Sequence, residues 1–249
     1  WRWRSFRNGT STPGKLARFL KAPAEFNSAK GLQVNKQIAV LLSGRGSNFE
    51  SLLASSRAGS LGGDIGLVIS NRPTAGGLQI AQDAGIETAL IDHQQYPSRE
   101  AFDRDLAGAI DSISPDLVVL AGFMRILTPG FVARFSKRLM NIHPSLLPWY
   151  PGLHTHQRAL DNGDSHAGAT VHYVTGELDG GPPVLQAKVP VHSGDDADAL
   201  AARVLAVEHQ IYPVAVSWHL TNRLTWHDGN LLKDGVPVPP TGESWENAS

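Results

Sequence analysis

The chain becomes regular at Ile38-Ala39-Val40-Leu41-Leu42, an apolar run that leads into Ser43-Gly44-Arg45-Gly46-Ser47-Asn48 and then into apolar residues at helical spacing. This order predicts a strand, a glycine-containing loop and a helix. The pattern recurs, with apolar runs at residues 65–69, 88–91 and 116–120 separated by helical segments near 75–84 and 98–113. Strands that are apolar along their whole length need cover on both faces. The sequence therefore predicts an α/β fold with a doubly wound, mostly parallel sheet and helices on both faces.

The pattern changes in the carboxyl-terminal half. Residues 169–174 and 184–191 flank a glycine-rich turn, Glu177-Leu178-Asp179-Gly180-Gly181, and are expected to form antiparallel strands added to the sheet. A helix of about 20 residues is expected from Asp195 or Asp196, since apolar residues recur on one face. In open α/β sheets of this kind, binding sites lie at the carboxyl ends of the parallel strands.

The organisation predicted from composition is one main domain with two appendages. Residues 1–34 carry seven basic residues and one acidic residue without a core pattern, and we expect a disordered extension there. A transit segment, a basic arm or vector-derived sequence are the alternatives for this extension. The domain is expected over residues 35–240, with a small hairpin near 233–236, and residues 241–249 are expected to form a frayed tail.

Composition excludes several classes of protein. The 249 residues contain 22 Lys and Arg against 23 Asp and Glu, so the formal net charge of −1 gives no field that would attract nucleic acid or an anionic membrane. No apolar run approaches the roughly 20 residues of a membrane span. Cysteine is absent, which excludes disulfides and thiolate chemistry. We expect a soluble cytoplasmic protein, or an organellar one if the extension is a transit segment.

The loop Ser43–Asn48 is a candidate phosphate site. It lacks the third glycine of a dinucleotide fingerprint and the Gly-Lys-Ser/Thr of a P-loop, so neither NAD nor ATP is indicated. Small residues would allow a phosphate to approach the backbone, and Ser47 and Asn48 would add side-chain donors at the start of a helix. The alternative is that Ser47 or Asn48 only caps the helix.

The stretch Asn141-Ile142-His143-Pro144-Ser145-Leu146-Leu147-Pro148 follows a short apolar run and is stiffened by two prolines. On an extended backbone, Asn141 and His143 would point to the same side, because side chains alternate along a strand. An amide donor beside an imidazole suits a reaction in which an oxyanion forms near a group that exchanges a proton. The alternative for this octapeptide is that local turn hydrogen bonds satisfy both side chains.

Other polar residues leave their roles open. His154 and His156 could share a metal, but no third ligand with suitable spacing is evident, and no metal site is predicted. His172 lies among apolar residues of an expected strand, where a buried structural histidine and a catalytic partner are equally compatible with the pattern. Asp179 precedes a glycine and could be an ordinary turn residue. Within about 4 Å of His143 it would instead favour the imidazolium form.

Five blocks in order closely resemble the phosphoribosylglycinamide formyltransferases, a folate-dependent formyltransferase family. The blocks are Ser43–Asn48, Ala121–Leu127, Asn141–Pro148, Tyr150–His154 and Glu177–Pro182, within a resemblance that covers residues 36–240. It implies transfer of a formyl group from 10-formyltetrahydrofolate to the amine of phosphoribosylglycinamide, the third step of purine biosynthesis. The resemblance implies small-molecule substrates and direct transfer without a covalent enzyme intermediate or a metal. A monomer or a homodimer is compatible with it.

The resemblance also implies site residues. Asn141, His143 and Asp179 match the family's catalytic trio, in which Asn141 and protonated His143 would stabilise the oxyanion and Asp179 would support His143. The residues that match contacts to phosphoribosylglycinamide are Gly46, Ser47, Asn48 and Glu208. Those that match contacts to the folate are Arg99, Met124, Arg125, Ile126, Leu127, Asn141, Thr175, Gly176, Glu177, Leu178 and Asp179.

Two features depart from the family pattern. Gly176 stands where an acidic or larger residue is usual, and the basic extension has no counterpart in compact bacterial members. The rival interpretations are methionyl-tRNA formyltransferase, formyltetrahydrofolate hydrolase and a non-catalytic folate or nucleotide binding module. The first two would carry a further domain, and the near-neutral charge disfavours tRNA. The intact trio disfavours the binding module, although a fold alone never guarantees activity.

Overall fold

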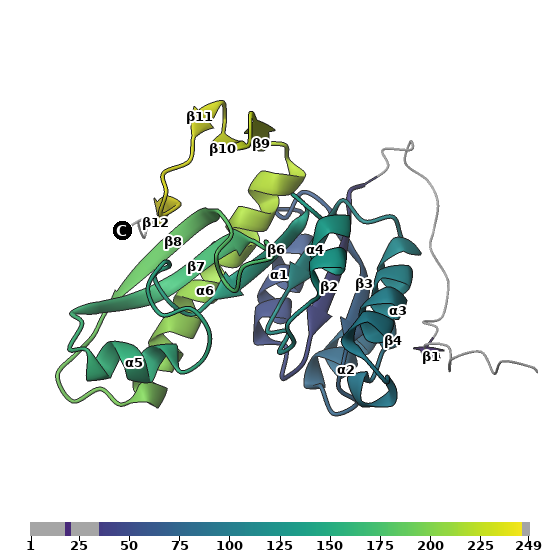
Figure 1. Ribbon diagram of the computed structural model, residues 1–249, viewed down its shortest axis with the longest axis horizontal. Coiled ribbons are helices and arrows are strands. Elements are labelled where there is room, and N and C mark those ends of the chain that lie inside the picture. Colours follow the sequence, from purple (N-terminus) through teal and green to yellow (C-terminus); the bar gives the residue numbers. More distant parts are fainter. Residues whose placement is uncertain (1–17, 21–34, 246–249) are drawn as a thin grey trace, which may run out of the picture.

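A computed structural model describes residues 18–20 and 35–245, and the described part contains one main sheet (Figure 1). Its strands are β1 (Arg18–Leu20), β2 (Gln37–Leu42), β3 (Asp64–Ser70), β4 (Glu87–Leu90), β5 (Leu117–Leu120), β6 (Leu139–His143), β7 (His166–Tyr173), β8 (Pro183–Pro190) and β12 (Glu243–Trp245). The strand order is β1-β4-β3-β2-β5-β6-β7-β8-β12. Within the group β2 to β6, every pair of neighbouring strands is parallel. Strand β7 pairs antiparallel with β6, and β8 pairs antiparallel with β7. The predicted mostly parallel sheet with antiparallel additions is confirmed.

Helices cover both faces of this sheet because the residues of β2 alternate between two cores. The helices are α1 (Ser47–Arg57), α2 (Gly76–Asp83), α3 (Arg99–Asp111), α4 (Pro129–Arg134), α5 (Thr155–Asp161) and α6 (Ala197–Leu220), and η1 (His93–Gln95) is a 3₁₀ turn. Ile38, Val40 and Leu42 pack in one core with residues of α1, α2 and α6, whereas Ala39 and Leu41 pack in the other with residues of α3 and α4. Each β2 residue from Ile38 to Leu42 is buried by one helical layer or the other, which explains the uninterrupted apolar run.

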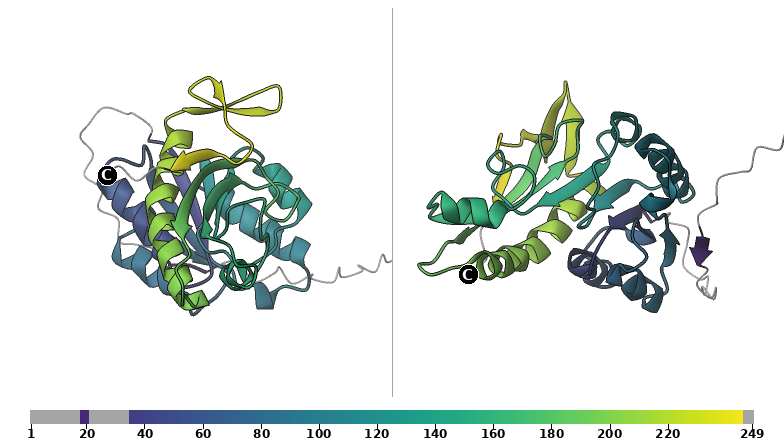
Figure 2. Two further views of the ribbon diagram at one scale, coloured as in Figure 1. Left: turned by 90° about the vertical axis from the view of Figure 1, so that its left-hand side faces the viewer. Right: turned by 60° about the horizontal axis from the view of Figure 1, so that its bottom comes forward.

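Helix α6 runs along one face of the sheet (Figure 2) and has 24 residues. Asp196 caps it by accepting a hydrogen bond from the N–H of Ala199 at 2.8 Å. The apolar residues on its expected inner face are all buried: Leu200, Val204, Val207 and Ile211. This confirms the predicted helix. Among the described residues, no helix is long and apolar enough to cross a lipid bilayer.

The carboxyl-terminal part is more ordered than we expected. The predicted hairpin is present as β10 (Asn230–Lys233) and β11 (Val236–Pro237), which join β9 (Leu224–His227) in a small separate sheet. The expectation of a frayed tail over residues 241–249 is wrong for Glu243–Trp245, because these residues form β12 and pair in parallel with β8. Pairing satisfies backbone groups at the free edge of β8. Residues 246–249 lie outside the described part of the chain.

At the amino terminus, residues 18–20 form β1 and pair antiparallel with β4. The rest of the expected disordered extension, residues 1–17 and 21–34, lies outside the described residues.

Three adjacent parallel strands set the position of the candidate site. β2 pairs with β5 and β5 pairs with β6, so the loops that follow these strands meet at one edge of the sheet. They carry the expected phosphate loop after β2, the expected folate loop after β5, and His143 at the end of β6. The fold therefore brings together segments separated by about a hundred residues.

Candidate active site

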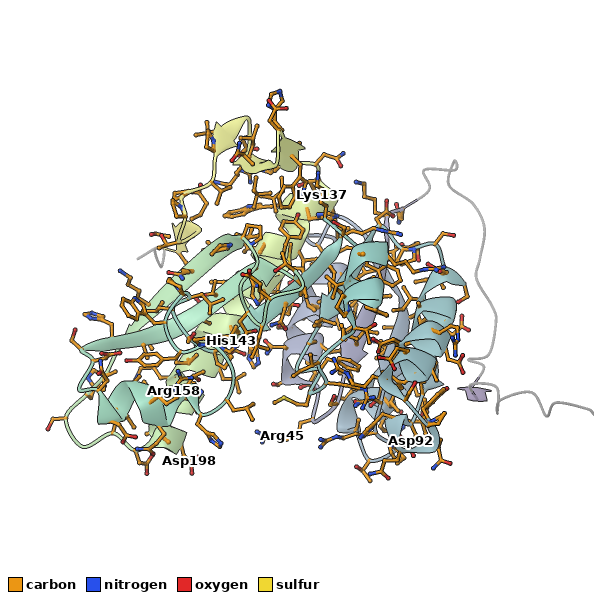
Figure 3. The ribbon with its side chains drawn as sticks, viewed as in Figure 1. Arg45, Asp92, Lys137, His143, Arg158 and Asp198 are labelled. Carbon is orange, nitrogen blue, oxygen red and sulfur yellow. The ribbon has the colours of Figure 1, made fainter. Side chains whose placement is uncertain are left out.

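The expected catalytic residues lie together on β6 and on the turn after β7. Asn141 and His143 are two apart on β6, and His172 of β7 is paired directly opposite Asn141. The turn between β7 and β8 folds back so that Asp179 Oδ2 lies 3.5 Å from His143 Nδ1 and Asp179 Oδ1 lies 3.8 Å from His172 Nε2. Figure 3 shows His143 near the middle of the molecule, with Arg45 of the loop after β2 below it.

The contacts of His143 suit a protonated imidazole. Its Nε2 donates a hydrogen bond to the backbone oxygen of Tyr150 at 2.9 Å, and its Nδ1 faces the Asp179 carboxylate. Both ring nitrogens therefore face acceptors, and only imidazolium carries a proton on each nitrogen. The two side chains are 7% and 11% exposed, so little water screens their interaction.

His172 is the residue whose role the sequence left open. Its Nδ1 donates to the backbone oxygen of Tyr173 at 3.0 Å, which leaves Nε2 to accept a hydrogen bond from Asn141 Nδ2 at 3.1 Å. Burial lowers the pKa of His172 to about 4, an effect that outweighs the backbone hydrogen bond and the nearby Asp179 carboxylate. The neutral ring thus orients the Asn141 amide, and the second N–H of that amide remains available for a ligand.

The turn that carries Asp179 depends on close packing. Asp179 has a left-handed φ of +51°, which aspartate tolerates better than most residues, and its Oδ2 accepts a hydrogen bond from the N–H of Gly152 at 2.8 Å. A Cβ on Gly181 would lie 1.8 Å from the backbone oxygen of Tyr173, so only glycine fits there. These constraints hold the carboxylate against both histidines.

The loop after β2 leaves the start of α1 open. Gly46 is the N-cap residue with φ +92°, and a Cβ there would lie 2.7 Å from Gly77 Cα. No side chain caps the helix, so the alternative that Ser47 or Asn48 is only a cap is wrong. The first N–H groups of α1 and its dipole are therefore available to an anion such as a phosphate.

Asn48 joins this loop to α6. Its Nδ2 donates to Glu208 Oε2 at 2.7 Å, across 160 residues of sequence. Glu208 is 6% exposed, and burial raises the pKa of its carboxyl group, although the Asn48 hydrogen bond partly opposes the shift. Asn48 Oδ1 is buried and has no hydrogen-bond partner among the described residues. Asn48 Oδ1 and the Glu208 carboxyl group are buried acceptors beside the phosphate loop, and both are suited to accept hydrogen bonds from the hydroxyl groups of a ligand.

The loop after β5 presents apolar side chains on a fixed backbone. Met124 and Ile126 are 64% and 62% exposed, while Leu127 is buried. Arg99 Nη2 donates to the backbone oxygen of Ile126 at 2.9 Å, and the Arg125 guanidinium stacks on a neighbouring aromatic ring of α3. Exposed apolar side chains of this kind commonly cover a flat ligand.

The residues before Asp179 lie at the surface of the same turn. Gly176 and Glu177 are exposed, Thr175 is half-buried, and Leu178 is 60% exposed. A Cβ on Gly176 would meet nothing within 4 Å, so the departure from the family pattern is not forced by packing.

The two histidines at the start of α5 do not join the cluster. His154 is exposed with φ +58°, and His156 Nδ1 is buried and has no hydrogen-bond partner in the described part of the chain. Within the described residues, no group of three or more metal-ligating side chains has the geometry to hold an ion. A cavity of about 290 Å³ lies beside this loop, and neither His143 nor Asp179 lines it.

The chain is similar to proteins of one family over most of its length. A family model described as formyl transferase matches residues 36–216. Phosphoribosylglycinamide formyltransferase of Escherichia coli (strain K12) is 51% identical over 205 residues, covering 82% of this chain and 97% of that protein. The enzyme of the same name from Haemophilus influenzae is 42% identical over 207 residues, covering 83% and 98%. The solved structure of phosphoribosylglycinamide formyltransferase from Coxiella burnetii in complex with CHES superposes with a TM-score of 0.82 and 44% identity, covering 85% of this chain and all of that one.

Proposed function

The chain belongs to the formyl transferase family, and from this premise we propose that it transfers the formyl group of 10-formyltetrahydrofolate to the amine of phosphoribosylglycinamide. The products are formyl-phosphoribosylglycinamide and tetrahydrofolate, which places the reaction in purine biosynthesis. The single observation that supports this most strongly is the packing of His143 against Asp179, beside Asn141 and at the edge of the sheet that also carries the open start of α1.

In the proposed reaction the substrate amine attacks the formyl carbon. A carbon–nitrogen bond forms, and the carbonyl oxygen becomes an oxyanion that the free N–H of Asn141 and the His143 imidazolium stabilise. Without substrate, His143 Nε2–H donates a hydrogen bond to the Tyr150 carbonyl oxygen. In the reaction this N–H donates to the oxyanion instead. Asp179 stabilises the imidazolium and relays the proton lost by the amine to the folate nitrogen. The bond from the formyl carbon to that nitrogen then breaks.

The acceptor is proposed to bind between the loop after β2 and α6. Its phosphate would lie on Gly46, Ser47 and Asn48, where backbone N–H groups and the dipole of α1 favour an anion. Its ribose hydroxyl groups would donate to Glu208, which is already held by Asn48. This placement points the amine towards the carboxyl end of β6 and thus towards His143.

The folate is proposed to bind against the loop after β5 and the turn after β7. Met124 and Ile126 supply apolar cover, and Arg99, fixed by its bond to the Ile126 carbonyl, would attract the folate carboxylates. Backbone groups from Arg125 to Leu127 and from Thr175 to Asp179 would read the edge of the pterin ring. This arrangement puts the formyl nitrogen beside Asn141 and Asp179. No metal is part of the proposed mechanism.

The test is formyl transfer by the purified chain, followed as release of tetrahydrofolate with and without phosphoribosylglycinamide. We expect release only when the acceptor is present, with one formylated product per tetrahydrofolate. Release that ignores the acceptor would contradict the proposal and indicate a formyltetrahydrofolate hydrolase. Binding of both substrates without release would contradict it and indicate a binding module.

Two properties follow as proposals from the family and the composition. We propose a cytoplasmic protein, or an organellar one if residues 1–34 are a transit segment, and a monomer or a homodimer. Fractionation of cells and light scattering of the purified chain test these two statements.

A further inference from the structure

Ser43 makes hydrogen bonds to two other strand ends. It directly follows β2 and is 4% exposed. Its backbone N–H donates to the carbonyl oxygen of Gly122 at 3.1 Å, and its Oγ accepts from the N–H of Met124 at 2.8 Å. Its hydroxyl proton goes to Asn71 Oδ1 at 2.6 Å. The side chain therefore uses its donor and an acceptor position at once, which leaves it a single orientation.

Asn71 holds this hydroxyl in place. It directly follows β3 and is 1% exposed, and its backbone oxygen accepts a hydrogen bond from His93 Nδ1 at 2.9 Å. Because Asn71 Oδ1 takes the Ser43 proton, the Ser43 Oγ presents a lone pair to Met124. The hydrogen-bond series from Asn71 through Ser43 to Met124 thus joins the carboxyl ends of β3, β2 and β5 in the interior.

These hydrogen bonds connect two loops that are proposed to bind different substrates. Ser43 is the first residue of the loop whose later residues, Gly46 to Asn48, are proposed to hold the acceptor phosphate. Met124 belongs to the loop proposed to cover the folate. One buried hydroxyl therefore fixes the backbone of the folate loop from within the phosphate loop.

We propose that Ser43 is a positioning residue for the formyl-folate, which sets the conformation of the loop from Gly122 to Leu127 through the Met124 N–H. The inference rests on the proposed function of that loop. Ser43 touches neither substrate and acts through Met124. Removing its hydroxyl leaves the Met124 N–H without its acceptor, whereas the main-chain bond from Ser43 to Gly122 and the start of α1 stay intact.

The primary variant is Ser43→Ala in the full chain, measured by titration calorimetry with tetrahydrofolate and by steady-state kinetics. We expect the Kd for tetrahydrofolate and the KM for 10-formyltetrahydrofolate to rise about five- to tenfold, the usual effect of losing one buried hydrogen bond. The KM for phosphoribosylglycinamide should change less than twofold. Ser43→Cys, whose thiol has the same connectivity but is larger and a weak acceptor, should shift the folate constants in the same direction.

Ser70→Ala is the matched control. Ser70 ends the neighbouring strand β3 and is 0% exposed, and among the described residues its hydroxyl bonds only to the backbone of Arg72 in its own loop, at 3.0 Å. We expect this variant to bind tetrahydrofolate like the parent chain. Hydrogen exchange at the Met124 amide should be faster in Ser43→Ala and unchanged in Ser70→Ala.

The inference is overturned if both Ser43 variants bind tetrahydrofolate like the parent chain. Equal losses for folate and acceptor, or an equal loss in Ser70→Ala, would also overturn it and indicate a general effect on the fold. The parent chain separates this inference from the proposed function: if it neither binds tetrahydrofolate nor forms product, the proposed function itself fails.

Discussion

Replacing Asp179 with Asn removes one charge while disturbing little else. Asparagine has the same size and also tolerates the left-handed φ of +51° at this position. Its side-chain oxygen can still accept the hydrogen bond from Gly152. What changes is the charge opposite His143 Nδ1, at a distance of 3.5 Å.

The size of the effect follows from that distance and from burial. The Asp179 side chain is 11% exposed, so the interaction is poorly screened. Two unit charges 3.5 Å apart interact by about 5 kcal/mol at an effective dielectric constant of about 20, which is an upper bound for the loss. Because the amide and water recover part of it, we expect kcat to fall by about 10²- to 10³-fold, or roughly 3–4 kcal/mol in the barrier.

The assay is tetrahydrofolate release at saturating concentrations of both substrates, with KM measured separately for each. We expect both KM values to stay within about threefold of the parent, because the change affects the transition state more than the bound substrates. A kcat within threefold of the parent would refute the role given to the Asp179 carboxylate. Thermal unfolding of the variant checks that the fold is retained.

Three further predictions concern the same region. Glu208→Gln should raise the KM for phosphoribosylglycinamide about tenfold or more. Burial raises the pKa of Glu208, so its charge destabilises the folded chain above that pKa, and the variant should have a higher Tm than the parent at pH 7 and a smaller gain at pH 4. Equal gains in Tm at both pH values would contradict this prediction. Gly181→Ala should lower the free energy of unfolding by about 1–3 kcal/mol, because its Cβ would meet the Tyr173 oxygen, while Gly176→Ala should not; equal melting temperatures would contradict this. His172 has a pKa of about 4 in the fold against 6.5 in the unfolded chain, so the unfolded chain binds an extra proton between these values and the free energy of unfolding should fall by about 3 kcal/mol from pH 6.5 to 4. In urea unfolding, the free energy of unfolding of His172→Gln should depend less steeply on pH than that of the parent. An equal dependence on pH would contradict the prediction.

The alternation of the fold was predictable because it depends on short-range pattern. The apolar run of β2 divides between two cores, so its composition already required cover on both faces. Asn141 and His143 were predictable for the same reason, since two residues separated by one position on a strand share a face. These features depend on neighbours in the sequence and not on the path of the chain.

Contacts between distant segments could not be derived from the residues alone. Asp179 reaches His143 only because the turn after β7 folds back over the sheet, and no local pattern encodes that path. The contact of Asn48 with Glu208 depends on the packing of α1 against α6, and only the family resemblance pointed to Glu208. His172 remained ambiguous because its role follows from the register of β7 against β6.

Strand β12 was missed because pairing with another strand, and not its own sequence, stabilises it. β12 contains Glu243, Ser244 and Trp245, which carry no strand pattern of their own, and the free edge of β8 gives them their structure. The alternative that Ser47 or Asn48 caps α1 was wrong because Gly46, with a left-handed backbone, takes the N-cap position. The presence of Ser and Asn in the sequence does not indicate that a glycine before them begins the helix.

A single-turnover measurement on His143→Ala shows whether the His143 imidazolium stabilises the oxyanion during formyl transfer. The matched control is His227→Ala, because His227 also faces an aspartate, Asp228, at 3.1 Å, but its side chain is 75% exposed. With 10-formyltetrahydrofolate and phosphoribosylglycinamide bound in excess enzyme, we predict that His143→Ala binds both substrates with near-parent affinity but transfers the formyl group at least about a thousandfold more slowly. Transfer at the parent rate would contradict the account, and loss of substrate binding alone would make His143 a binding contact.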